Sequence, residues 1–132
     1  MEVRRAEVVT YHFLDCELDH RRFRLCRRGI AIDLEPRVFD VLIYLVEQRD
    51  RLVSRRELID SIWQGQAVGS SVITRAICLA RKAVRCPRAI RTVHTRGYQW
   101  VLPVEAVPGY EVEVTGSRQR SYRQPFGESK SL

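Results

Sequence analysis

The spacing of hydrophobic residues changes twice along this 132-residue chain, and these changes constrain its fold more than any other feature. In the first third, the segments VVTYHF, CELD, RFRLCR and IAIDL alternate in the way that is typical of strands. From residue 36 to residue 84, hydrophobic residues recur every three or four positions, as on a helix. In IRTVHTRGYQWV, residues 90–101, the alternation returns. The sequence therefore predicts an α+β fold with an N-terminal antiparallel β-sheet, three helices and a C-terminal β-hairpin.

The N-terminal strands are expected to form a small sheet with one apolar face. In RFRLCR, Phe23 and Leu25 alternate with polar positions and should share a face. Arg27, Arg28 and Gly29 follow, and the glycine marks them as the tip of a hairpin. The next segment continues the alternation with Ile30, Ile32 and Leu34.

The first two helices have recognisable starts. Pro36 suits the first helical position, and the acidic Glu35 before it favours the positive end of the helix dipole. Ser54 and Glu57 have the S-x-x-E spacing of a capping box, in which both side chains bond free backbone N–H groups. The positions expected in the core are Val38, Val41, Leu42, Leu45, Val46, Leu58, Ile59, Ile62 and Trp63.

The third helix is expected to have one apolar and one basic face. It should run from Ser70 to about Val84, because Pro87 prevents its continuation. At about 100° per residue, one narrow face holds Ile73, Ala76, Ile77, Ala80 and Val84. The outer face and its flanks hold Ser71, Thr74, Arg75, Cys78, Arg81 and Lys82. The apolar face is predicted to join the core, which leaves the basic face for a partner.

The positive charge of the chain is concentrated in one region. The net charge is +7 with a pI near 9.7, which suggests a polyanionic partner. Residues 61–104 contain seven arginines and lysines and no carboxylate, so positive and negative residues balance in the rest of the chain. The functional surface is therefore expected within residues 61–104.

A basic helix face can read duplex DNA or can simply be solvated. A solvated helix usually mixes Glu with Lys in i,i+4 pairs, and the absence of any acid here favours DNA. Arg96, at the tip of the predicted hairpin, can reach a minor groove or a phosphate, with Arg91 and His94 nearby. The alternative is an ordinary hairpin with a solvated arginine.

The order of sheet, three helices and hairpin resembles the OmpR/PhoB-type winged helix-turn-helix domain of bacterial transcription regulators, most closely its ToxR/CadC-like branch. The segments that carry the resemblance are LDHRRFRLCRRGIAIDLEPRVFDVLIYLVEQRDRLVSRRELIDSIW, SVITRAICLARKAV and IRTVHTRGYQWV. It covers residues 11–102. His20, Cys86 and Thr95 depart from the usual pattern without threatening the fold.

The resemblance implies a DNA-binding transcriptional regulator. The third helix would be the recognition helix in the major groove, and the hairpin would be the wing at the minor groove. Ser54 and Arg55 would lie near a phosphate, and the loop from Gln64 to Gly69 would contact RNA polymerase. Members of this family often bind paired direct repeats, so the resemblance adds a second copy of the chain, as a homodimer on DNA, to the partners to be tested.

The remaining residues are expected to form flanking segments. Residues 1–10 are expected to be an N-terminal extension and residues 103–132 a flexible tail, because hydrophobic residues become sparse there. The longest apolar run, from Val41 to Val46, is too short to span a membrane, and no signal peptide is evident. A cytoplasmic location is therefore expected.

Other functions are less favoured by the sequence. A protein-interaction module would need an exposed apolar patch, and a single-strand binder would need exposed aromatics, whereas Tyr98 and Trp100 alternate as packing residues. Non-specific binding of nucleic acid remains the other alternative. No catalytic motif stands out, and no cofactor is expected. A metal or redox role has little support among the four cysteines and three histidines: Cys16, Cys26, Cys78, Cys86, His12, His20 and His94.

Overall fold

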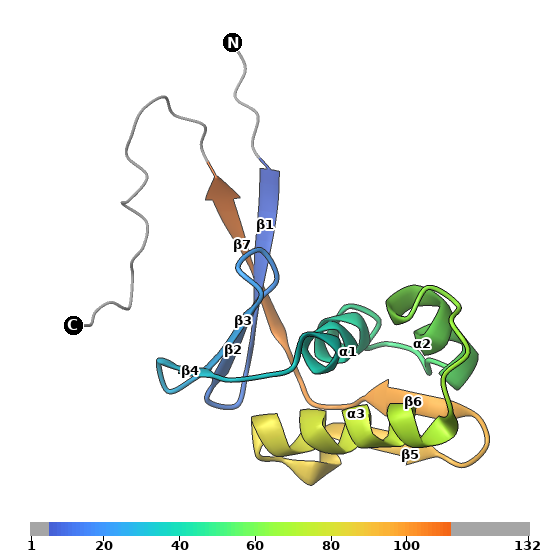
Figure 1. The fold of residues 1–132 in the computed structure, drawn as a ribbon. Coiled ribbons are helices and arrows are strands. Elements are labelled where there is room, and N and C mark those ends of the chain that lie inside the picture. Colours follow the sequence, from blue (N-terminus) through green and yellow to red (C-terminus); the bar gives the residue numbers. More distant parts are fainter. Residues whose placement is uncertain (1–5, 112–132) are drawn as a thin grey trace.

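Between residues 6 and 111, the fold consists of a five-stranded sheet, three α-helices and a separate two-stranded hairpin (Figure 1). The computed structural model describes residues 6–111. In chain order the elements are β1 (Ala6–Phe13), β2 (Cys16–Asp19), β3 (Arg24–Arg27), β4 (Ile30–Ile32), α1 (Pro36–Glu47), α2 (Arg55–Ile62), α3 (Ser70–Val84), a 3₁₀ turn (Pro87–Ala89), β5 (Ile90–Val93), β6 (Gly97–Trp100) and β7 (Glu105–Glu111). The predicted α+β class and the predicted order of sheet, helices and hairpin are confirmed.

The sheet is antiparallel, with the strand order β4-β3-β2-β1-β7. Leu25 on β3 pairs with Leu18 on β2, and both side chains are buried. Between β3 and β4, Arg28 and Gly29 have φ values of 54° and 79°, as a tight hairpin turn requires. The hairpin tip predicted there is confirmed.

The expected apolar face of this sheet is only partly correct. Phe23 precedes β3 in a turn with φ of 52°, and it is 65% exposed, although its ring packs edge-on against Phe39 with centroids 5.1 Å apart. Ile30 is 68% exposed on β4, which lies at the edge of the sheet. The alternation of residues therefore identified the strands correctly but not which apolar side chains they bury.

The five-stranded sheet extends at both ends beyond residues 11–102, the range that the resemblance covers. Residues 103–132 were expected to be a tail, yet β7 pairs with β1 over seven positions, from Ala6↔Glu111 to His12↔Glu105. Likewise, Ala6–Phe13 is one strand, so its first residues belong to the domain and not to an extension. Pro108 is tolerated because β7 is an edge strand, where a missing N–H disrupts pairing on one side only. Residues 1–5 and 112–132 lie outside the described part of the chain.

The helices begin as the sequence predicts, with one exception in detail. Pro36 is the first residue of α1, and all the apolar positions named for α1 and α2 are buried. At α2, the Ser54 side chain accepts a hydrogen bond from the backbone N–H of Glu57 at 3.0 Å. The Glu57 carboxylate, however, does not complete the capping box, because it binds Arg51 and Tyr44 instead.

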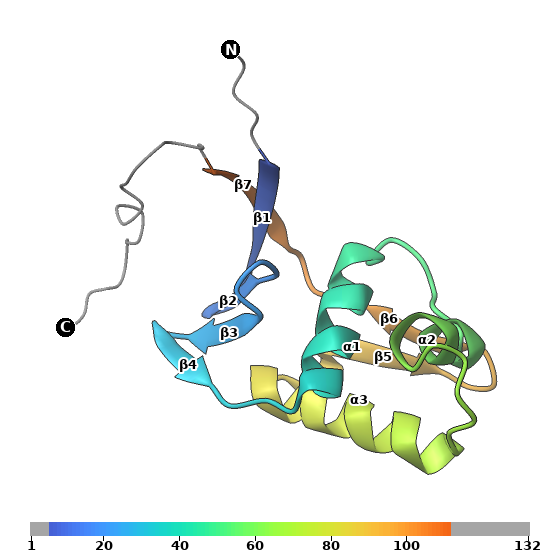
Figure 2. The same ribbon diagram turned by 45° about the horizontal axis from the view of Figure 1, so that its top comes forward.

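A single core joins the sheet, the helices and the hairpin. Helix α1 contacts α2, α3 and β6, and it lies between the sheet and the hairpin (Figure 2). Phe13 on β1 meets Trp100 on β6 edge to face, with ring centroids 4.7 Å apart. Because α1 packs on α3 and β6 together, the third helix and the hairpin are held in a defined relationship.

Candidate nucleic-acid interface

Helix α3 presents the outer face that the sequence predicts. Ser71, Thr74, Arg75, Cys78 and Lys82 are exposed along it. The opposite face is buried and consists of Ile73, Ala76, Ile77, Ala80 and Val84. The helix ends where predicted, and Arg85 caps it in the left-handed conformation with φ of 59°. The chain thus fixes α3 in the core by one side and leaves a 15-residue helix accessible on the other.

Arg75, on this outer face, already has a partner. Its Nη1 and Nη2 atoms donate to the two carboxylate oxygens of Glu35, at 3.1 and 2.9 Å. Glu35 is the residue that precedes α1, and its side chain makes no cap hydrogen bond to that helix. The hydrogen bonds from Arg75 hold the pKa of the Glu35 carboxyl below its usual range. Sequence reasoning assigned Glu35 to the helix dipole and missed this contact.

Arg81, unlike the other residues of the outer face, is hydrogen-bonded to the hairpin. Its Nε and Nη2 atoms donate to the backbone carbonyl of Ile90 at 3.0 and 2.7 Å, and Nη2 also donates to Thr92 Oγ1 at 2.9 Å. The side chain is only partly exposed. Arg81 therefore fastens β5 to α3, and this contact holds the hairpin beside the helix.

The β5–β6 hairpin places three exposed residues at its tip: His94, Thr95 and Arg96. The turn is closed by a hydrogen bond of 2.8 Å from the Arg96 N–H to the Val93 carbonyl. Arg91 lies further down the hairpin, exposed, with Nη2 3.3 Å from the side-chain oxygen of Gln99. Tyr98 and Trp100 are 8% and 1% exposed, so their assignment as packing residues is confirmed.

Strand β6 touches the chain that leads into α2 at the end nearest the hairpin tip. Val53 and Tyr98 exchange two backbone hydrogen bonds, both of 2.8 Å. A Cβ atom built on Gly97 would lie 2.1 Å from the Val53 carbonyl oxygen and 2.8 Å from the Ser54 Cα. Only a residue without a side chain therefore fits at position 97. Ser54 and the exposed Arg55 that follows it are thereby held close to the tip end of the hairpin.

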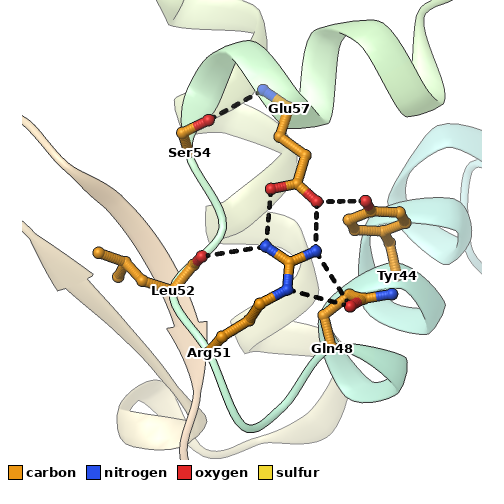
Figure 3. Close-up of polar contacts among 6 residues, drawn as sticks. All are labelled: Tyr44, Gln48, Arg51, Leu52, Ser54 and Glu57. Carbon is orange, nitrogen blue, oxygen red and sulfur yellow. Dashed lines mark hydrogen bonds and ion pairs between the residues drawn. The ribbon is translucent and has the colours of Figure 1, made fainter.

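An ion-pair network fixes the start of α2 to α1 (Figure 3). Arg51 donates through Nη1 and Nη2 to both oxygens of Glu57, at 2.9 and 2.6 Å. Its Nε and Nη2 atoms also donate to Gln48 Oε1, and Tyr44 donates its hydroxyl to Glu57. These contacts lower the pKa of Glu57 and raise that of Arg51. The sequence contained no periodic signal for this network, because Arg51 lies in a turn.

The loop between α2 and α3 is accessible. Residues 64–67 are exposed, and Gln64 and Gly65 have φ values of 48° and 73°. The backbone N–H of Gly65 donates to the Ile59 carbonyl at 3.0 Å, which ties the start of the loop to α2. The loop that begins at Gln64 and ends at Gly69 therefore has a defined start and a free outer surface.

A second basic surface lies at the C-terminal end of α3. A depression of about 400 Å³ is lined by Leu14, Asp15, Arg27, Arg28, Val84 and Arg85. Arg28 and Asp15 form an ion pair of 2.9 Å there, and this hydrogen bond lowers the pKa of Asp15. The depression is separate from the outer row of α3 and from the hairpin tip.

The four cysteines are free thiols. Cys78 is exposed on α3, whereas Cys16 is 3% exposed in the sheet, and burial raises the pKa of its thiol to about 11. Between residues 6 and 111, no three His, Cys, Asp or Glu side chains come together as metal ligands. Within the same residues, no helix combines the length and the apolar character needed to cross a membrane.

The chain is similar to known proteins over this same region. Residues 29–100 match the family described as "Transcriptional regulatory protein, C terminal". The transcriptional activator CadC of Escherichia coli K12 is 35% identical over 86 residues, which are 61% of this chain and 17% of CadC. The regulator PrrA of Mycobacterium tuberculosis is 29% identical over 102 residues, 76% of this chain and 43% of PrrA. The chain thus spans less than half the length of either relative.

Solved structures share the fold. The DNA-binding domain of E. coli CadC superposes with a TM-score of 0.65 at 30% identity, covering 77% of this chain and 98% of that domain. The DNA-binding domain of Klebsiella pneumoniae RstA, solved in complex with the RstA box, has a TM-score of 0.59 at 23% identity, covering 69% of this chain and 95% of that domain. The shared architecture is that of winged-helix DNA-binding domains of the OmpR/PhoB type.

Proposed function

Because the chain belongs to the family of C-terminal domains of transcriptional regulatory proteins, of the OmpR/PhoB type, we propose that it is a sequence-specific, double-stranded DNA-binding transcriptional regulator. Helix α3 enters the major groove, and the β5–β6 tip reaches the adjacent minor groove. The chain acts by binding DNA, without a catalytic step and without a cofactor. It works in the cytoplasm, where the DNA of its bacterial relatives lies.

The observation that carries this proposal is the exposed outer face of α3. A major groove about 12 Å wide admits one helix. On that face Arg75 can donate to guanine, and Ser71 and Thr74 can bond several base edges. Lys82 adds a charge for phosphates, and the helix itself carries no carboxylate. A face of this kind supports base reading as well as phosphate binding.

The hairpin tip supports the second contact. Arg96 and His94 are exposed there, and the hairpin is fastened to α3 through Arg81. Because the hairpin is held at a fixed distance from the recognition helix, its cation can reach the adjacent groove in only one position of the domain along the duplex. Arg91, together with Ser54 and Arg55 at the start of α2, is assigned to backbone phosphates.

Two protein partners belong to the proposal. The exposed loop from Gln64 to Gly69 lies beside α3 and is available to RNA polymerase when the helix is in the groove. A second copy of the chain on a neighbouring half-site is the other. The structure contains one chain, so both partners rest on the likeness to the family.

The experiment that tests this function is selection of binding sites from a randomised duplex pool at about 0.15 M salt, where non-specific electrostatic binding is weakened. An enriched motif, above all one repeated after a helical turn, would support a sequence-reading regulator. A pool that stays random but is retained in a salt-sensitive way would reduce the function to phosphate binding. Absence of retention would favour the protein-interaction alternative.

A further inference from the structure

A carboxylate reaches the outer face of α3 from another part of the chain. No acidic residue lies between Asp60 and Glu105 in the sequence, so α3 has none of its own. Glu35, however, lies 40 residues before Arg75 and binds its guanidinium through two parallel hydrogen bonds. One negative charge is therefore built into the surface that is proposed to receive a polyanion.

The contact occupies the atoms with which Arg75 would bind DNA. Its Nη1 and Nη2 atoms point at the two oxygens of Glu35, at 3.1 and 2.9 Å. A guanine offers O6 and N7, and a phosphate offers two oxygens, in a similar side-by-side arrangement. The carboxylate of Glu35 thus presents the same pattern of acceptors as the ligand, and the same edge of Arg75 cannot serve both.

The ion pair between Arg75 and Glu35 is also weak. The side chains of Arg75 and Glu35 are 62% and 52% exposed, and an exposed ion pair contributes little to stability. Glu35 has no second hydrogen-bond partner among the described side chains, and it does not cap α1. Nothing in the geometry therefore suggests that the fold depends on this contact.

We propose that Glu35 is an internal competitor for DNA, whose carboxylate occupies Arg75 in the free domain and releases it when the domain binds a duplex. This inference rests on the proposed function, because it assigns a role to the same surface. Glu35 lowers the affinity for DNA in two ways: its pair with Arg75 must be broken, and its charge then faces the phosphates. Only a DNA site that accepts well-aligned hydrogen bonds from Arg75 offsets both effects.

The test measures binding of the wild-type chain and of Glu35→Gln to the duplex enriched by selection, over a range of salt concentrations. Glu35→Gln is expected to raise the affinity about three- to tenfold at low salt and to steepen the dependence of log K on log salt by up to about 0.9, since Arg75 becomes a free cation. The matched control is Asp15→Asn, which frees Arg28 from an exposed pair whose N–O distance is also 2.9 Å; that pair lies in the depression at the C-terminal end of α3 and not on the outer face that holds Arg75. Its affinity is expected to stay within about twofold of the wild type.

A thermodynamic cycle separates competition from a general effect of charge. In an Arg75→Ala background, Glu35→Gln should no longer raise the affinity by the same factor. An equal rise in that background, or an equal rise from Asp15→Asn, would overturn the proposal, as would a fall in affinity on Glu35→Gln. If the wild-type chain binds the selected duplex and Glu35→Gln does not change its affinity, this inference fails while the proposed function stands. If neither protein binds any duplex, both this inference and the proposed function are overturned.

Discussion

Gly97, in the β5–β6 hairpin, lies directly against Val53. A Cβ atom at position 97 would come within 2.1 Å of the Val53 carbonyl oxygen. This oxygen also accepts the backbone hydrogen bond of Tyr98, so it cannot move away without breaking the bridge between the hairpin and the start of α2. The glycine at position 97 is therefore explained by packing as well as by its positive φ.

Gly97→Ala is expected to destabilise the fold by roughly 2 kcal/mol or more, since a backbone clash adds to the strain of a φ of 141°. The measurement is urea unfolding at neutral pH. Gly29→Ala is the matched control: its φ is 79°, but nothing lies within 4 Å of the added Cβ. A loss of stability no larger for Gly97→Ala than for Gly29→Ala would contradict the packing argument.

Arg81→Ala is expected to lower the free energy of unfolding by about 1 to 3 kcal/mol, because three hydrogen bonds from a charged group to Ile90 and Thr92 are lost. Lys82→Ala, one residue further along α3, should change it by less than about 0.5 kcal/mol, because Lys82 is exposed. Both can be measured by urea unfolding. Equal stabilities for the two variants would argue against the role of Arg81 in holding the hairpin.

The Arg51–Glu57 pair predicts a specific dependence of stability on pH. The pKa of Glu57 is lowered in the folded state, chiefly by hydrogen bonds from Arg51. Its contribution to stability is therefore present above the ordinary carboxyl pKa of 4.5 and is lost as the pH falls through the lower, folded value. We expect Glu57→Gln to be less stable than the wild type at pH 7, with a difference that shrinks at pH values below about 4. A difference that stays constant from pH 7 to pH 3 would exclude this linkage.

Arg96→Ala is expected to weaken binding to all duplexes by a similar factor and to reduce the slope of log K against log salt by up to about 0.9. The reason is that Arg96 is exposed at the hairpin tip and does not contribute to the core. Its free energy of unfolding should match the wild type, which serves as the internal control. Unchanged affinity and slope would remove the hairpin tip from the interface.

The cysteines are expected to react with iodoacetamide in the order of their exposure. Cys78 should be modified first, and Cys16 roughly a hundredfold more slowly, because it is buried and its pKa is raised to about 11. Mass spectrometry of peptides after timed alkylation gives both rates. The selected duplex should slow modification of Cys78, and Cys78→Ser should abolish the fast phase. Protection of Cys16 but not of Cys78 by the duplex would place DNA elsewhere.

Much of the fold was predictable because its signals are local. The bounds of α3, its buried and exposed faces, the first residue of α1 and the turn at Arg28 and Gly29 all follow from patterns within a few residues. Strand β7 was missed because Pro108 and Gly109 are poor strand formers. It forms because β1 offers it an edge, and that edge comes from the other end of the described chain.

The sequence by itself determined that α3 is a basic helix whose own residues include no carboxylate, with one apolar and one polar face, because helical periodicity assigns each side chain to a face. It could not determine what each cation on that face contacts. Arg81 lies nine residues before Ile90, and Arg75 lies 40 residues after Glu35, so both partners are set by how the helices and the hairpin pack. The tertiary structure therefore decided that Arg81 supports the wing and that Arg75 is paired before any ligand arrives. The physical reason is that contacts between distant segments depend on the whole core, which no local pattern encodes.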